Sequence, residues 1–166
     1  MTELPPGERS DPHTASMLLH SVLRLNDVLE HALCLHLGIN ETDFHALQHL
    51  MLDHPMTPGD LAAKLNISSA ATTALIDRMS RHGFVIRSAH PTDRRSLLLH
   101  PSPLAVSRTM TALRPLFADA EHGIHGLSPE GQRSVVHYLE HILAAMQNRI
   151  DTLTPPAATK KRNERS

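Results

Sequence analysis

The chain has 166 residues, a length typical of one domain with a sizeable core, and a formal net charge of −1. Hydrophobic residues make up 40% of it and aromatic residues only 2%, which favours packed aliphatic helices over a β-sandwich. No apolar run approaches the ~18 residues of a membrane-spanning helix, and the amino terminus lacks a signal-peptide core. A single cysteine excludes an internal disulfide. We therefore expect a cytoplasmic protein.

The first part of the chain predicts two helices. Residues 1–14 are polar and are expected to be disordered. A long amphipathic helix is predicted over about 15–37 from the spacing of its apolar residues, which are Leu18, Val22, Leu25, Leu29 and Ala32. A second helix, about 41–54, is opened by Asn40 with Asp43 three residues later, a pair typical of a capping box.

Two short helices separated by a tight turn follow. Thr57-Pro58-Gly59-Asp60 is a helix start, with a hydroxyl N-cap, proline at the first position and a carboxylate at the third. Asn66 suits the left-handed conformation that closes this helix. Ser68 caps the next helix, expected over 68–82, and Gly83 ends it. Its apolar stripe consists of Leu75, Ile76 and Met79.

A β-hairpin is predicted after these helices. Strands over 84–87 and 96–100 flank a turn-rich segment, 90–95, that ends in Asp93-Arg94-Arg95. Two capped helices and then a hairpin are the order of a winged helix-turn-helix, which places one helix in the DNA major groove. An ordinary helical hairpin followed by an ordinary β-hairpin is the alternative.

The second of the two short helices has a face that its apolar stripe does not use. Ser69 and Thr73 lie four residues apart on that face, where short side chains let a backbone approach base edges closely. Residues 57–100 hold six Lys and Arg against three Asp, a net +3, whereas 17–54 carry a net −4. Positive charge is therefore concentrated where phosphates would bind.

The last part of the chain predicts two more helices. One starts at Ser102-Pro103 and runs to about Glu121, with Gly123 and Gly126 as breakers. The other starts at Ser128-Pro129 and carries an apolar stripe of Val135, Leu139, Ile142, Met146, Ile150 and Leu153.

These terminal helices carry more apolar surface than a small winged lobe, residues 41–102, covers. We therefore interpret 15–40 and 103–153 as dimerisation helices of a homodimer, with helices folded back onto their own lobe as the alternative. Residues 154–166 form a basic tail.

The fourteen histidines leave a second interpretation open. Pairs four residues apart bind metals from one helix face, and a zinc site from Cys34, His36, His45 and His49 is conceivable. Redox sensing by Cys34 is another alternative, although its apolar neighbours indicate a buried, inert thiol. We predict no metal and no cofactor, because the sequence has no tight Cys/His cluster.

No enzyme motif is present: the chain lacks a glycine-rich phosphate loop, an HExxH sequence and a G-x-S-x-G sequence. The stronger rival to DNA binding is a helical protein-interaction module. Such a module would use the same amphipathic helices without needing the Asp93-Arg95 hairpin.

Over about residues 17–153 the sequence resembles the MarR-type (multiple antibiotic resistance) transcriptional regulators. The resemblance is most specific at Asp93-Arg94-Arg95 with the following Leu97, Leu99 and Ser102. Thr73, Asp77-Arg78 and Gly83-Phe84-Val85 resemble the family's recognition helix and its exit. The implied fold is mainly α with a small β-wing, a winged helix-turn-helix joined to N- and C-terminal dimerisation helices.

The resemblance also implies a function. The chain would be a dimeric repressor that reads a pseudo-palindromic operator in double-stranded DNA with recognition helix 68–82 and wing 88–96. A small phenolic or lipophilic effector would bind between the dimer helices and the lobe. Arg95 would enter the minor groove with Asp93 holding it, Ser69 and Thr73 would face the major groove, and Arg78 would support the wing or a phosphate. The predicted DNA-binding set is Ser68, Ser69, Thr73, Arg78, Asp93, Arg94 and Arg95.

Overall fold

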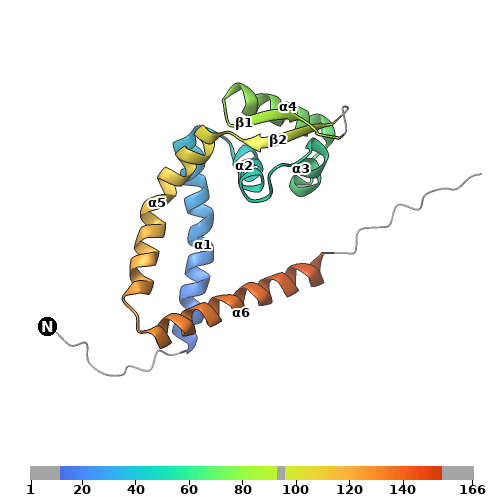
Figure 1. Ribbon diagram of the computed structural model, residues 1–166. Helices are drawn as coiled ribbons and strands as arrows, with labels where there is room; N and C mark the ends of the chain where they lie inside the picture. Colours follow the sequence, from blue (N-terminus) through green and yellow to red (C-terminus); the bar gives the residue numbers. More distant parts are fainter. Residues whose placement is uncertain (1–11, 93–95, 155–166) are drawn as a thin grey trace, which may run out of the picture. The chain divides into compact units, whose positions relative to one another are not determined.

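The computed structural model describes residues 12–92 and 96–154, and in them six helices and two strands follow one another (Figure 1). The helices are α1 (Pro12–Leu37), α2 (Glu41–Asp53), α3 (Pro58–Leu65), α4 (Ser69–Arg81), α5 (Pro103–His125) and α6 (Pro129–Leu153). The strands are β1 (Val85–Ala89) and β2 (Leu97–Pro101). The predicted class, mainly helical with a small β-wing, is confirmed. The chain divides into two compact units, Met1–Arg114 and Pro115–Ser166.

The core of the first unit lies where α2, α3 and α4 gather with the β1–β2 hairpin (Figure 1). The strands pair antiparallel, Val85 opposite Pro101, and Met56 adds a bridge to Leu99 on the other side of β2. The predicted apolar stripe of α4 is buried in this core. The largest fully buried side chains come from every one of these elements except β1, and they are Leu47, Leu50, Leu61, Leu75, Met79, Leu99 and Thr72.

The predicted helix signals around the turn are confirmed. The Thr57 hydroxyl accepts from the Asp60 main-chain N–H at 3.2 Å, and the Asp60 carboxylate accepts from Thr57 in return. Asn66 adopts a left-handed conformation with φ of 52°, and Gly83 ends α4 with φ of 75°. Asn40 caps α2 by accepting from the main chain three residues on. At each of these helix ends, the residue that the sequence predicts as a cap therefore forms a hydrogen bond with a backbone group that the helix itself leaves unpaired.

Several element boundaries differ from the predictions; both strands, for example, end later than predicted, at Ala89 and Pro101. The expected break of α5 near Glu121 is wrong, because the helix continues through Gly123 to His125. A glycine in an exposed helix costs only about 1 kcal/mol, which neighbouring good helix formers offset. The first strand begins at Val85 because the Phe84 N–H still donates to the Met79 carbonyl that closes α4. The helix α1 begins at Pro12, earlier than expected.

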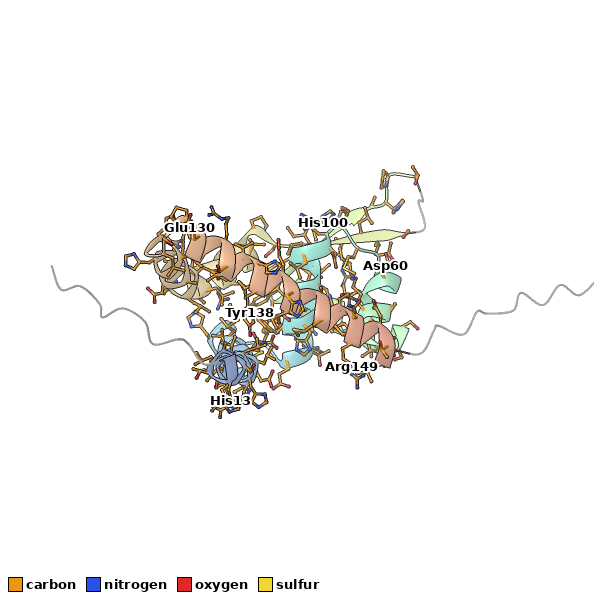
Figure 2. The ribbon with its side chains drawn as sticks, turned by 90° about the horizontal axis from the view of Figure 1, so that it is seen from below. His13, Asp60, His100, Glu130, Tyr138 and Arg149 are labelled. Carbon is orange, nitrogen blue, oxygen red and sulfur yellow. The ribbon has the colours of Figure 1, made fainter. Side chains whose placement is uncertain are left out.

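The amphipathic terminal helices keep most of their apolar side chains exposed in the single chain. On α1 these side chains are Met17, Leu18, Val22, Leu23, Leu25, Val28 and Leu35. On α6, along which Figure 2 labels Glu130, Tyr138 and Arg149, no residue is buried. No helix within the described ranges is both long and apolar enough to cross a membrane.

Ser102 connects the wing to the start of α5. Its hydroxyl donates to the Gly83 carbonyl at 2.6 Å and accepts from the Ala105 N–H at 3.0 Å, and its own N–H donates to the Phe84 carbonyl. The side chain is buried, so these polar groups have no water to replace a lost partner.

We expect Ser102→Ala to lower the free energy of unfolding by about 1–2 kcal/mol, because it leaves a buried carbonyl and a helix-start N–H without partners. Urea denaturation followed by circular dichroism measures this loss. The exposed Ser107→Ala on the same helix is the matched control and should change stability by less than about 0.5 kcal/mol. Equal effects of the two substitutions would contradict the proposed role of Ser102.

Candidate nucleic-acid interface

The predicted recognition helix is α4, and its solvent-facing row consists of residues four apart. Ser69, Thr73, Asp77 and Arg81 are all exposed and follow one another along this row. The Thr73 hydroxyl donates to the Ser69 carbonyl at 2.9 Å, so its methyl group and the acceptor lone pairs of its oxygen remain for a partner. Ser68 caps the helix by accepting from the Ala71 N–H, as predicted. The structure thus places Ser68, Ser69 and Thr73 together at the exposed start of α4.

Arg78 lies on another side of α4 and contacts α2. Its Nε and Nη2 atoms donate to the two carboxylate oxygens of Asp43 at 2.8 and 2.5 Å. The Asp43 side chain is only 4% exposed, and Asn40 donates to the same carboxylate. The hydrogen bonds that Arg78 donates to the Asp43 carboxylate raise the pKa of the guanidinium above its ordinary value. In this structure Arg78 therefore ties the recognition helix to α2, and its contact with a phosphate or the wing stays a prediction.

The contact between the wing and α4 is made by Arg87, a residue that the sequence reasoning did not select as a site residue. Its Nη2 donates to the Asp77 carboxylate, and its Nε donates to the Ser80 hydroxyl at 3.2 Å. Arg87 lies on β1, ten residues beyond Asp77, and nothing in the spacing alone pairs them. The predicted wing residues Asp93, Arg94 and Arg95 lie outside the residues that the structure describes.

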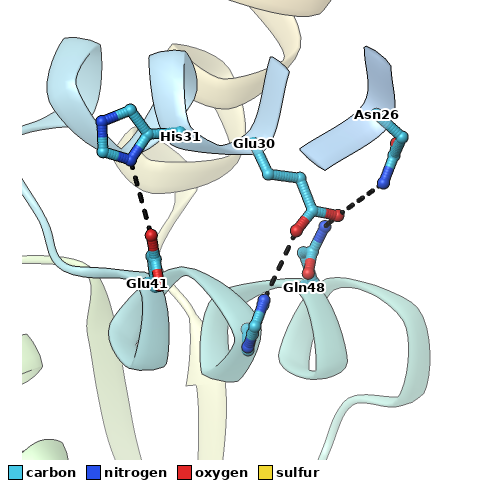
Figure 3. Close-up of polar contacts among 6 residues, drawn as sticks. Asn26, Glu30, His31, Glu41 and Gln48 are labelled. Atoms are coloured by element: carbon cyan, nitrogen blue, oxygen red, sulfur yellow. Dashed lines mark hydrogen bonds and ion pairs between the residues drawn. The ribbon is translucent and has the colours of Figure 1, made fainter. Parts of the chain in front are cut away.

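Two histidines and two glutamates join α1 to α2 (Figure 3). His31 Nδ1 lies 3.4 Å from the Glu41 carboxylate, and His45 Nε2 lies 3.4 Å from that of Glu30. Glu30 also accepts from Asn26 and Gln48. Within residues 12–92 and 96–154, no three histidine, cysteine, aspartate or glutamate side chains are grouped to hold a metal ion. The predicted zinc alternative therefore finds no assembled site in these ranges.

Cys34 lies on α1, near these contacts between α1 and α2. Its side chain is only 4% exposed, so its predicted burial is confirmed. Burial, followed by the carboxylates of Glu41 and Glu30, raises the pKa of the thiol above its ordinary value. The reactive thiolate is consequently disfavoured at neutral pH.

An open cleft of about 750 Å³ lies between the end of α1, the start of α2 and α4. Its wall is mostly aliphatic and includes Leu35, Ile39, Ile67 and Ala74. Polar groups at its edge come from His31, Glu41 and Arg78. The cleft thus presents an apolar surface beside a guanidinium and connects α1 with the recognition helix.

Comparison with known proteins yields one family model and several curated relatives. The model of the MarR family matches residues 39–97. The HTH-type transcriptional regulator YcgE of Bacillus subtilis is 33% identical over 111 residues, 66% of this chain and 72% of the relative. The HTH-type transcriptional repressor YetL of the same organism is 36% identical over 76 residues, 45% of each protein.

Solved structures have the same fold at lower sequence identity. A transcriptional regulator from Thermotoga maritima aligns with 84% of this chain and 98% of its own, with a TM-score of 0.62 and 20% identity. A mutant of MepR from S. aureus, bound to an oligodeoxyribonucleotide, aligns with 80% of this chain and 98% of its own. Its TM-score is 0.53 and its identity 18%.

The Asp43–Arg78 contact predicts a structural rather than a phosphate-binding effect of substitution. We expect Arg78→Met to lower the free energy of unfolding by about 2–4 kcal/mol, because it leaves a buried carboxylate unpaired. The double substitution Asp43→Leu/Arg78→Met should recover most of this loss. Urea denaturation measures both, and Arg133→Met, which breaks the exposed contact with Glu130 on α6, is the control. Failure of the double substitution to recover stability would contradict the pairing argument.

The buried thiol predicts slow modification. Because its pKa is raised, we expect Cys34 in the folded protein to react with a chromogenic disulfide reagent at least about tenfold more slowly at pH 7.5 than in guanidinium. The rate should increase as the pH is raised toward the pKa of the thiol. The unfolded chain is the internal control, since it holds the same single cysteine. Fast reaction of the folded protein would reopen the redox alternative.

Proposed function

Because the chain belongs to the MarR family of DNA-binding transcriptional regulators, we propose that it is an effector-responsive homodimer that represses transcription. The observation that supports this most directly is the exposed start of α4, with Ser69 and Thr73 one helical turn apart beside the wing. Short side chains at these positions allow the helix backbone to approach base edges in the major groove. The repressor YetL, which is 36% identical to this chain over 76 residues, supports repression as the direction of regulation. Such a regulator works in the cytoplasm, where its DNA lies.

The exposed apolar stripes support the dimer. Residues such as Leu18, Val22 and Leu25 on α1 are each more than half exposed in the single chain. Tyr138, Leu139 and Met146 leave a comparable apolar face on α6. Apolar surface of this extent is covered in a stable protein, and a second copy of the same chain offers the same stripes. We therefore assign the dimerisation role to residues 15–40 and 103–153, and DNA binding to residues 41–102.

The cleft between α1 and α4 supports control by a small molecule. A planar or lipophilic body would lie on Ile39, Ile67 and Ala74. Since the cleft is bounded by both a proposed dimerisation helix and the recognition helix, a bound molecule would change the spacing of the two lobes. An effector of this kind shifts the population toward a form that does not bind DNA.

Footprinting of the purified protein on genomic DNA tests the proposal. We expect pseudo-palindromic sites whose half-sites lie one helical turn apart, ~34–36 Å between centres, and a dimer mass by sedimentation. Addition of phenolic acids should release these sites, and a chelator or an oxidant should leave them occupied. Release by the chelator or the oxidant instead would favour the zinc or redox alternative. Absence of any protected site would favour a protein-interaction module.

The wing residue Arg95 is proposed to read a narrow minor groove. We expect Arg95→Ala to weaken operator binding by about 1–3 kcal/mol, in line with the loss of one specific arginine contact. Fluorescence anisotropy with a labelled operator measures this change. Arg149→Ala on α6, which removes the same charge, is the control and should leave affinity nearly unchanged. Equal affinities of the two variants would remove Arg95 from the mechanism.

A further inference from the structure

The solvent-facing row of α4 contains a carboxylate at a position that would face DNA. Ser69, Thr73 and Asp77 are spaced four apart, so they lie on one side of the helix. The Asp77 side chain is 52% exposed. A carboxylate in this position repels the phosphates of a duplex that approaches Ser69 and Thr73, unless its charge is balanced nearby.

Arg87 supplies that balance from the wing. Its guanidinium reaches across from β1 and donates to the Asp77 carboxylate and to the Ser80 hydroxyl. A small hollow beside the pair is lined by Thr73, Asp77 and Arg87 together with apolar residues of α4 and β2. The pair is therefore adjacent to the residue proposed to contact bases, at the corner between the recognition helix and the wing.

The other cation on this row contacts the main chain of Asp77. Arg81 follows Asp77 on the row, and its Nε donates to the Asp77 main-chain oxygen at 3.4 Å. Lys64 and Arg78 contact Asp53 and Asp43, respectively. Among the described residues of the lobe, Arg87 is thus the cation bound to the Asp77 carboxylate.

We propose that Arg87 is a positioning residue for DNA binding that acts by neutralising Asp77. The inference rests on the proposed function, since it assumes that the row of Ser69 and Thr73 faces the duplex. Without Arg87 the carboxylate stands uncompensated in the interface, and repulsion weakens all duplexes rather than one sequence. When the charges of both Arg87 and Asp77 are removed, the repulsion disappears again.

A double-substitution cycle on the full-length protein tests this. Arg87→Gln, Asp77→Asn and the double variant are compared with the wild type for binding to a generic 24-base-pair duplex over a salt series, and for retention on heparin. We expect Arg87→Gln to weaken duplex binding by about tenfold or more, with the largest loss at low salt. The double variant should return to within about threefold of the wild type, and Asp77→Asn alone should bind at least as well as the wild type.

The outcomes separate neutralisation from other roles. Arg133→Gln removes an equal charge from the exposed pair on α6 and is the matched control. Thermal unfolding of each variant shows whether a loss of binding is a loss of fold. A double variant as weak as Arg87→Gln would overturn the proposal, because it would mean that Arg87 contacts a phosphate or only anchors the wing. Weak binding of Asp77→Asn alone would overturn it too.

If the proposed function is wrong, the experiment gives a different result from failure of the charge-neutralisation proposal. A wild-type protein that binds no duplex would end the DNA-binding proposal, whereas heparin, itself a polyanion, would still test the charge balance. Earlier elution of Arg87→Gln than of the double variant supports neutralisation, and equal elution of these two variants contradicts it.

Discussion

The contact between Asp43 and Arg78 holds the recognition helix in place. A carboxylate that is almost fully buried has to be paired, and the guanidinium that pairs with it lies thirty-five residues later, on α4. Because Asp43 also sits at the start of α2, where Asn40 caps the helix, a displacement of α4 would disturb that cap. The orientation of the exposed row of α4 is thereby fixed by an interaction on a different side of the helix.

Two further contacts fix the wing with respect to the same helix. Ser102 joins the end of α4 to the start of α5 through the Gly83 carbonyl, and Arg87 joins β1 to Asp77. Arg108 on α5 stacks over the Phe84 ring at 5.6 Å and donates to the Leu37 carbonyl at the end of α1. A change in the position of α1 or α5 would therefore act on the junction of helix and wing through these contacts of Arg108. This is the coupling that regulation of DNA binding through the proposed dimer helices requires.

Local features were predictable from the sequence because their signals act over a few residues. The caps at Thr57 and Ser68, the left-handed Asn66 and the stripe of α4 depend on neighbours within one or two helical turns. The pairs Asp43–Arg78 and Asp77–Arg87 were not predictable, since a charged residue matches many partners and only the packed core selects one. The prediction that α5 breaks at Gly123 was wrong because it relied on the low helix propensity of a single residue. A long helix tolerates one unfavourable residue.

The pairings change how the charge of the lobe is understood. The net +3 of residues 57–100 already counts Asp77 against Arg87. It does not count Asp53 and Asp43, which lie outside this range and contact Lys64 and Arg78, respectively. The charge of Lys64 and Arg78 is therefore largely compensated at short range, so it contributes little to the attraction of phosphates. In the proposed DNA contact, specific binding would then depend on helix backbone, short side chains and the wing more than on a general basic surface. It follows that the dependence of binding on salt should be shallower than the net charge alone indicates, because fewer counterions are released per lobe.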